Sequence, residues 1–335
     1  MKTPLLFDAH AVAACSRQAA VDAIDIALAS GVDPADDLSR DIVPLHAGQF
    51  LLMPSERSPT GAHVGIKVAT VAPDNPARGL PRIQASYLLF DAETLALRAV
   101  LDGTALTTLR TPAVSVAAVR PRLLAGTGPL RLAVVGAGPQ ARGHVATLAA
   151  ALPAARSLAS VTYLVRDAGR VAPADGADVV ALGSTRSDHV LRTADVIVCA
   201  TSARAPLFDA DLVADTAVVV AIGSHEPDVR EVSAALCSRA TVVVEDVTTA
   251  LREAGDVVLA VHEGALRPQD LVPMRDVVTG RVILDPNRPL LFKGVGMSWQ
   301  DLAIAELIVS EYAAGYCQCH VRRIAAERSG CPSDV

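Results

Sequence analysis

A glycine-rich turn carries the clearest chemical signal in the sequence. Gly136, Gly138 and Ala141 form a G-x-G-x-x-A pattern, which follows an apolar run at 131–135 and precedes an alanine-rich segment at 140–151. The first glycine permits a tight turn, the second lets backbone N–H groups approach a pyrophosphate, and the alanine lets a helix pack closely on a sheet. The pattern favours a dinucleotide site, and a glycine turn that serves packing alone is the alternative.

The end of the next expected strand bears on which dinucleotide would bind. Folds that bind NAD usually place an acidic residue there for the ribose 2′-OH. Arg166 follows Val165 at that point, and its cation suits the 2′-phosphate of NADPH, whereas the neighbouring Asp167 leaves NADH open. Thr201 and Ser202 follow a later apolar run, at the edge where such folds hold the nicotinamide. A turn held by these two hydroxyls is the alternative.

Three cations stand out in the first third of the chain: Arg40, Lys67 and Arg110. Lys67 lies in an apolar run at 64–68, where a charge must be paired or face a cavity. Converging cations suit a substrate carboxylate, which an arginine can grip with two parallel hydrogen bonds. For each cation taken alone, a structural ion pair is the alternative.

Lysine is rare in this chain, which makes each lysine within a motif a stronger candidate for a functional role. Of 30 basic residues only Lys2, Lys67 and Lys293 are lysines, so arginine serves wherever an ordinary solvated cation is needed. An ammonium can be desolvated and its pKa shifted, which a guanidinium does not allow. We therefore expect functional roles for Lys67 and Lys293.

The elements that must position these residues fall into two regions. The first shows short strands that pair as hairpins, and from residue 130 apolar runs alternate with helical or turn segments, which predicts a parallel sheet. The fold class is therefore α/β, with a Rossmann-type doubly wound parallel sheet at 126–299 and a mixed α+β domain at 1–125 and 300–335. The elements expected in the first region are helices at 8–30 and 103–119 and strands at 50–53, 63–71, 83–90 and 96–101. The later strands are expected at 131–135, 161–165, 179–182, 196–200, 218–222 and 241–244, followed by a helix at 299–316.

Composition excludes several classes of protein. A chain of 335 residues suits two domains, and 51% hydrophobic against 20% charged residues argues against intrinsic disorder. The net charge of −6, without a basic run, argues against a nucleic-acid partner. No apolar stretch reaches the roughly 18–20 residues of a membrane span, and Asp8 interrupts the N-terminal apolar run, so we expect a cytoplasmic protein.

The six cysteines show no disulfide spacing. The segment Cys317-Gln318-Cys319-His320 looks like a metal clip, but the chain offers no second pair of ligands for it. We expect no metal site.

Together the motifs resemble the ornithine cyclodeaminase/mu-crystallin family over nearly the whole chain. The matching elements, in order, are Arg40, Gly65-Ile66-Lys67, Asn75 with Gly79-Leu80-Pro81, Leu109-Arg110-Thr111, Gly136–Ala141, Phe292–Gly296 and Asp301-Leu302-Ala303. The resemblance implies a homodimer in which the Rossmann domain binds NAD(P) and the mixed domain serves substrate binding and dimerisation. It also implies that active-site clefts lie between these domains.

The resemblance also implies roles for individual residues. Carboxylate binding falls to Arg40, Lys67 and Arg110, and the nicotinamide packs near Val295 and Gly296. The residues expected to contact the cofactor are Gly136, Gly138, Pro139, Gln140, Ala141, Arg166, Thr201, Ser202, Val295 and Gly296.

The loop at 222–231 separates the chemistries found in this family. Cyclodeaminases carry a catalytic aspartate where this chain has His225, and Asp228 comes three residues later. Imine reduction needs a carboxylate clamp, a hydride donor and a proton, and His225 is a possible proton source because histidine titrates near neutrality. We therefore predict an NAD(P)H-dependent reductase of small cyclic ketimine carboxylates that forms L-proline or L-pipecolate. The alternatives are an ornithine or lysine cyclodeaminase with tightly bound NAD, and a non-catalytic ligand-binding protein.

Overall fold

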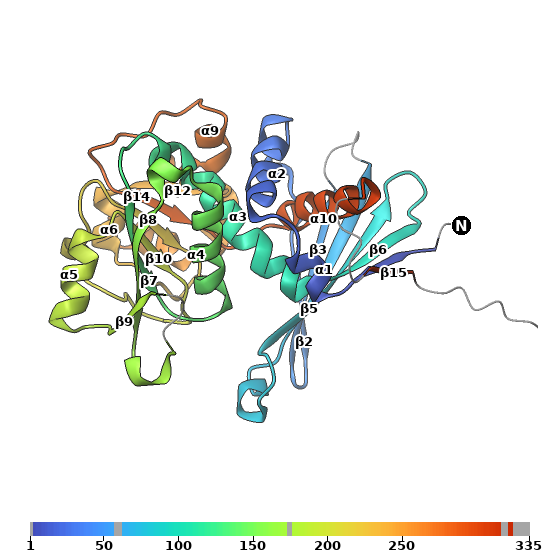
Figure 1. Cartoon of the computed structure of the whole chain (residues 1–335), viewed down its shortest axis with the longest axis horizontal. Helices are drawn as coiled ribbons and strands as arrows, with labels where there is room; N and C mark the ends of the chain where they lie inside the picture. Colours follow the sequence, from blue (N-terminus) through green and yellow to red (C-terminus); the bar gives the residue numbers. More distant parts are fainter. Residues whose placement is uncertain (1–2, 57–61, 173–175, 316–320, 324–335) are drawn as a thin grey trace, which may run out of the picture. The chain divides into compact units, whose positions relative to one another are not determined.

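The computed structural model describes residues 3–56, 62–172, 176–315 and 321–323 (Figure 1). The chain divides into two compact units: unit 1 is Met1–Cys15, Leu38–Thr107 and Asp301–Val335, and unit 2 is Ser16–Asp37 and Thr108–Gln300. The boundaries pass through two helices, α3 (Gly103–Leu124) and α10 (Ser298–Ala313). The domain bounds expected from the sequence stay a prediction.

Unit 1 is built on a sheet with the strand order β15-β1-β6-β5-β4-β3-β2. From β2 to β6 the strands pair as antiparallel neighbours, which confirms the predicted hairpins. The strands β1 and β2 were not predicted, and β2 is exposed along its whole length, so it has no alternation to detect. The strands are β1 (Leu5–Phe7), β2 (Asp41–Leu45), β3 (Gly48–Glu56), β4 (His63–Val71), β5 (Ile83–Asp91), β6 (Leu97–Asp102) and β15 (Val321–Arg323).

The single helix expected at 8–30 is wrong. Two helices occupy this segment, α1 (Ala9–Ala13) and α2 (Arg17–Ala29). The Asp8 carboxylate accepts a hydrogen bond from the Ala11 N–H at 2.9 Å, and the Ser16 hydroxyl accepts one from the Ala19 N–H at 3.3 Å. Each helix therefore begins at its own N-cap, which the continuous apolar spacing concealed. The third helix, α3, also runs beyond the predicted end at residue 119.

Unit 2 contains an eight-stranded sheet in the order β13-β12-β14-β11-β10-β7-β8-β9, with all neighbours parallel. Its central strands are fully buried apolar runs, typical of a sheet covered on both faces. The predicted doubly wound fold is confirmed. The strands are β7 (Leu130–Val135), β8 (Leu158–Val165), β9 (Asp178–Ala181), β10 (Val196–Cys199), β11 (Val218–Ala221), β12 (Thr241–Val244), β13 (Val272–Pro273) and β14 (Leu290–Lys293).

The strand order creates a crevice at the carboxyl ends of β7 and β10. The chain leaves β7 toward β8 on one side, while β10 lies on the other side, so the loops after β7 and β10 diverge. The remaining helices of unit 2 are α4 (Pro139–Ala151), α5 (Thr185–Thr193), α6 (Ala234–Arg239), α7 (Val247–Glu253), α8 (Gly255–His262) and α9 (Met274–Val278). Within the described ranges, no helix has the length and apolar character to cross a membrane.

Candidate active site

The glycine turn after β7 is held tightly against the end of β10. Gly136 has φ +105°, a conformation that L side chains rarely adopt, and a Cβ there would lie 2.6 Å from the Ala200 carbonyl oxygen. Ala141 is fully buried on α4, as close packing of helix on sheet requires. These residues of the G-x-G-x-x-A pattern thus have the local environments that the sequence predicted.

The N-terminus of α4 suits an anion. Gly138 is its N-cap and provides no side-chain hydrogen bond, and Pro139 opens the first turn. A Cβ at Gly138 would meet nothing within 4 Å, so the backbone there faces open space. The N–H groups of the first turn, Gln140 among them, are therefore presented to a ligand at the positive end of the helix dipole. These features fit a dinucleotide pyrophosphate.

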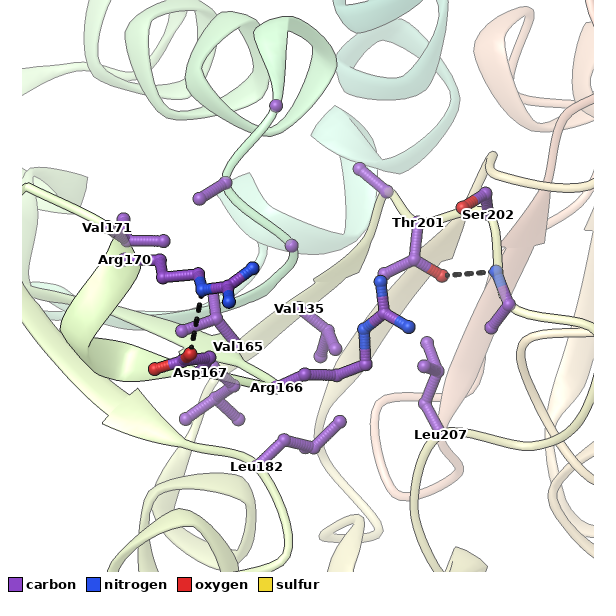
Figure 2. A pocket seen from close by; sticks show the side chains of 16 residues that line it. Val135, Val165, Arg166, Asp167, Arg170, Val171, Leu182, Thr201, Ser202 and Leu207 are labelled. Atoms are coloured by element: carbon purple, nitrogen blue, oxygen red, sulfur yellow. Dashed lines mark hydrogen bonds and ion pairs between the residues drawn. The ribbon is translucent and has the colours of Figure 1, made fainter. Parts of the chain in front are cut away.

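A pocket of about 1000 Å³ lies at this crevice, wholly within unit 2 (Figure 2). The turn at 136–138 forms one wall, the segment after β8 another, and residues 200–203 after β10 a third. Thr201 and Ser202 lie together on this third wall. Five of the predicted cofactor residues therefore line one cavity: Gly136, Gly138, Arg166, Thr201 and Ser202. The other five are not among the residues that line it: Pro139, Gln140, Ala141, Val295 and Gly296.

Arg166 and Asp167 differ sharply in what their side chains do. Arg166 is exposed and points across the pocket toward Thr201 (Figure 2). The Asp167 carboxylate accepts a hydrogen bond from the Gly169 N–H at 3.1 Å and pairs with the Arg170 Nε at 3.1 Å. Asp167, the acid that would favour NADH, is thus bound to its own loop, whereas Arg166 faces the cavity.

A buried carboxylate that the sequence did not single out ties together two loops at the pocket. Glu231 has no exposed surface. One of its carboxylate oxygens accepts hydrogen bonds from the Thr201 N–H at 2.8 Å and from the Thr201 hydroxyl at 2.7 Å. The other oxygen accepts a hydrogen bond from the Gly223 N–H at 2.7 Å. Burial raises the pKa of the Glu231 carboxyl, although the nearby Lys293 and these donors oppose the shift. Glu231 therefore fixes the predicted nicotinamide wall in place.

Lys293 supports the same region from β14. Its ammonium is fully buried, pairs with the Asp256 carboxylate at 2.9 Å and donates to the Ser224 carbonyl oxygen at 2.7 Å. The other Asp256 oxygen accepts hydrogen bonds from the N–H groups of Glu231 and Val232 at 2.7 and 2.8 Å. The pair thus holds both ends of the loop at 222–231.

His225 and Asp228 lie on the outer side of this loop. His225 is exposed, and the Asp228 carboxylate is 68% exposed and pairs with Arg204 at 2.9 Å. Within unit 2, Asp228 is therefore a surface ion-pair partner. The role of His225 as a proton source stays a prediction.

Arg110 belongs to a chain of buried polar groups. Its Nη1 donates to the Gln300 Oε1 at 3.0 Å, and the Gln300 Nε2 donates to the Glu245 carboxylate at 2.7 Å. The other Glu245 oxygen accepts hydrogen bonds from the N–H groups of Val295 and Gly296 at 2.8 and 2.9 Å. Unit 2 thus links Arg110 to the two residues where the nicotinamide is expected to pack.

In unit 1, Lys67 lies on β4 and pairs with Asp301 at the start of α10. Their charged atoms are 2.6 Å apart, and the two side chains are 4% and 0% exposed. Arg40 precedes β2 and is half-buried. Because Arg40 and Lys67 belong to one unit and Arg110 to the other, the convergence of the three cations stays a prediction.

Three cysteines lie within the part of the chain that the structure describes. Cys199 and Cys237 are buried free thiols, Cys15 is also buried, and burial raises the pKa of Cys199 well above its usual range. The described residues contain no group of three potential ligands that could hold a metal ion. The segment Cys317–His320 lies outside the described residues.

Comparison with known proteins follows the same lines as the geometry. The profile of the ornithine cyclodeaminase/mu-crystallin family matches residues 17–315. The chain is 34% identical to the Azospirillum brasilense Δ1-pyrroline-2-carboxylate/Δ1-piperideine-2-carboxylate reductase, covering 79% of this chain and 81% of that enzyme. It is 30% identical to mouse ketimine reductase mu-crystallin, covering 82% of this chain and 85% of the mouse protein.

A solved structure shares the fold. The Thermococcus litoralis Δ1-pyrroline-2-carboxylate reductase, in complex with NADH and L-proline, superposes with a TM-score of 0.80 at 23% identity, covering 93% of this chain and 98% of that one. The family predicted from the motifs is confirmed: the chain belongs to the ornithine cyclodeaminase/mu-crystallin family.

Proposed function

We propose that the protein is an NAD(P)H-dependent reductase of small cyclic ketimine carboxylates, converting pyrroline-2-carboxylate or piperideine-2-carboxylate to L-proline or L-pipecolate. The observation that carries this proposal is the 34% identity with the Azospirillum reductase over 79% of the chain. A cyclodeaminase needs a carboxylate partner for the substrate amines. Asp228, the aspartate three residues after His225, is instead exposed and paired with Arg204, which agrees with a reductase.

The cofactor would bind in the pocket of unit 2. The turn at 136–138 and the N-terminus of α4 would hold the pyrophosphate, with Pro139, Gln140 and Ala141 in the first turn. Thr201 and Ser202 would face the nicotinamide, along with the backbone at 295–296. When bound, the reduced nicotinamide supplies the hydride that reaches the imine carbon.

The substrate carboxylate would bind Arg40 and Arg110, and Lys67 would support it near the imine. A guanidinium suits this role because it presents two parallel donors to a carboxylate. The imine must also gain a proton to become electrophilic, and His225 is our candidate for the donor because histidine titrates near neutrality. The chain's own residues would thus bind, orient and protonate the substrate.

NADPH is the cofactor that the pocket favours over NADH. Arg166 points into the cavity, where a 2′-phosphate would meet its cation. Asp167, which would otherwise repel that phosphate and hold a ribose hydroxyl, is paired with Arg170.

The active form is a homodimer. The edge strand β2 exposes Ile42, Val43 and Leu45, and Ile83 on β5 is also exposed. An apolar sheet edge in water invites pairing with another chain. Light scattering of the purified protein measures this directly, and a monomeric mass at micromolar concentration would contradict it.

Steady-state oxidation of NADPH tests the reaction. We expect turnover with pyrroline-2-carboxylate and piperideine-2-carboxylate, and less with pyruvate plus an amine, because the cyclic imine arrives preformed. Ornithine and lysine should release no ammonia in the presence of NAD. Robust ammonia release would indicate a cyclodeaminase instead, and absence of any turnover would indicate a ligand-binding protein.

Arg110→Ala tests the carboxylate clamp. Loss of a charge-assisted bidentate contact should lower kcat/KM for the ketimine by roughly 10²-fold, mainly through KM. The same variant should keep its secondary structure by circular dichroism. Normal kinetics in a folded Arg110→Ala protein would remove this arginine from the site.

A further inference from the structure

A buried chain of hydrogen bonds runs from Arg110 through Gln300 and Glu245 to the backbone at 295–296. The chemistry of its members fixes which group donates and which accepts at each step. A guanidinium only donates hydrogen bonds and a carboxylate only accepts them. Gln300, placed between Arg110 and Glu245, must therefore turn its Oε1 toward the arginine and its Nε2 toward the carboxylate. Reversing any one of these groups would place two donors or two acceptors against each other in a buried site.

The chain is buried, and its middle member is anchored. Arg110 is 6% exposed, Gln300 0% and Glu245 3%. Asp37 accepts hydrogen bonds from the N–H groups of Ser298 and Trp299 at 2.7 and 3.1 Å, which fixes the first turn of α10 and with it Gln300. A buried hydrogen-bonded chain with a fixed middle member holds its members in one arrangement.

Gly296 closes the chain into a ring. Its N–H is held by Glu245 at 2.9 Å, its φ is +80°, and a Cβ on it would lie 2.6 Å from the Arg110 Nη1. The guanidinium thus packs directly on the backbone that Glu245 holds. A shift of Glu245 would move both the 295–296 backbone and, through Gln300, the guanidinium.

We propose that Gln300 and Glu245 are positioning residues that couple the grip on the substrate carboxylate to the seat of the nicotinamide. This rests on the proposed function, which places the carboxylate on Arg110 and the nicotinamide at 295–296. Neither residue touches the reacting atoms; Gln300 aims the guanidinium, and Glu245 sets the distance between it and the cofactor seat. Hydride transfer depends on such spacing, because the donor and acceptor carbons must be held to within about 0.5 Å of the productive geometry.

Exchanging the two side chains tests the direction of the chain. In Glu245→Gln the new amide cannot accept from both Gln300 and the 295–296 N–H groups, and in Gln300→Glu two carboxylates face each other. Each single variant should raise KM for pyrroline-2-carboxylate about 10-fold, the cost of a lost hydrogen bond to a charged group. Glu245→Gln should also weaken NADPH binding, measured by energy transfer from Trp299, the one tryptophan of the chain.

The double variant Glu245→Gln/Gln300→Glu should recover both properties. The carboxylate introduced at position 300 would accept from Arg110 and from the amide introduced at position 245. The oxygen of that amide would still accept from the 295–296 N–H groups, so every donor again meets an acceptor. We expect KM and NADPH affinity within about 3-fold of the wild type, a strongly non-additive cycle.

Ser115→Ala is the matched control. It removes a buried hydroxyl from the same helix as Arg110, one that lies 3.0 Å from the His144 Nε2, without touching the chain. It should lower the unfolding temperature but leave KM unchanged. Additive losses in the double variant, or unchanged single variants, would overturn the coupling. Wild-type protein that turns over no ketimine would contradict the proposed function instead, while recovery of NADPH affinity in the double variant would still support the coupling to the cofactor seat.

Discussion

The two buried lysines of this chain make similar ion pairs in different surroundings. Lys67 in unit 1 meets Asp301 at 2.6 Å, and Lys293 in unit 2 meets Asp256 at 2.9 Å. All four side chains are at most 4% exposed. Burying an ion pair costs desolvation that its attraction only partly offsets, so neither pair is explained by stability alone.

The difference lies in what surrounds each pair. The Lys293 pair holds backbone: the ammonium donates to a carbonyl at 224, and the aspartate accepts from the N–H groups of residues 231 and 232. The Lys67 pair joins the middle of a strand to the start of a helix. We interpret the Lys293 pair as the support of a loop, and the proposed role of Lys67 at the substrate carboxylate is what the variants below test.

The largest effect is expected from Lys293→Met. The substitution leaves the Asp256 carboxylate buried without its cation, so the free energy of unfolding should fall by about 3–5 kcal/mol. Adding Asp256→Asn should recover most of this loss, because the amide oxygen still accepts from the N–H groups of Glu231 and Val232. Urea unfolding followed by Trp299 fluorescence measures both changes.

Asp256→Leu in the Lys293→Met background is the contrasting variant. It also removes the charge, but it leaves two buried N–H groups without an acceptor, at a cost of about 1–3 kcal/mol for each. Equal stability of the Asn and Leu double variants would show that the Lys293–Asp256 pair does not support the loop backbone. The contrast between the two lysine pairs would then be wrong.

The effect of acid on the free energy of unfolding should distinguish the buried base His144 from both lysine ion pairs. Its Nδ1 lies 2.8 Å from the Gln140 carbonyl oxygen, which can only accept, and burial lowers the pKa of His144 from 6.5 to about 4. The unfolded chain therefore takes up a proton first as the pH falls. The stabilisation is fully present above pH 6.5 and is lost between pH 6.5 and 4, by about 3 kcal/mol in total.

His144→Gln removes this titration while keeping a polar side chain. The variant should be less stable than the wild type at about pH 8, yet its free energy of unfolding should depend less on pH between 6.5 and 4. Unfolding in urea at several pH values gives the two slopes. Identical slopes would assign the acid sensitivity to other groups, the lysine pairs included.

Local patterns predicted the elements and the cofactor turn well. The strand at His63–Val71 and the turn at Gly136–Gly138 follow from alternation and from glycine spacing, both of which depend on neighbouring residues. The rarity of lysine singled out Lys67 and Lys293, and both side chains are buried, but the functional roles expected of them stay a prediction. The break between α1 and α2 was missed because apolar spacing continues across it.

The partners of the site residues could not be predicted in the same way. Asp301 is 234 positions from Lys67, and Gln300 is 190 positions from Arg110. Only the folded chain brings such residues together, and a carboxylate such as Glu231 looks in the sequence like any surface acid. A partial signal existed, because Asp301 lies in a motif shared with the family.

Lys67→Met should lower catalysis more than it lowers cofactor binding. We expect kcat/KM for pyrroline-2-carboxylate to fall about 10²-fold, with the Kd for NADPH within about 3-fold of the wild type. Lys293→Met should show the opposite pattern, since its loop contacts the wall that carries Thr201. Lys67→Met leaves the buried Asp301 carboxylate without the Lys67 cation. The double variant Lys67→Met/Asp301→Asn also removes that negative charge, so it should regain stability without regaining activity. Recovery of activity in that double variant would make Lys67 a structural residue like Lys293.

The smallest effect is expected from Arg166→Ala, which removes a cation that no fold element needs. Because Arg166 is exposed, the free energy of unfolding should stay within about 0.5 kcal/mol of the wild type. The Kd for NADPH should rise about 10-fold through loss of the 2′-phosphate contact, while the Kd for NADH should change less than about 2-fold. Arg186→Ala, at an exposed arginine that pairs with Asp178 at 2.7 Å, is the matched control and should change neither affinity. Equal losses for both cofactors would show that Arg166 does not read the phosphate. Cofactor choice would then have to come from another wall of the pocket.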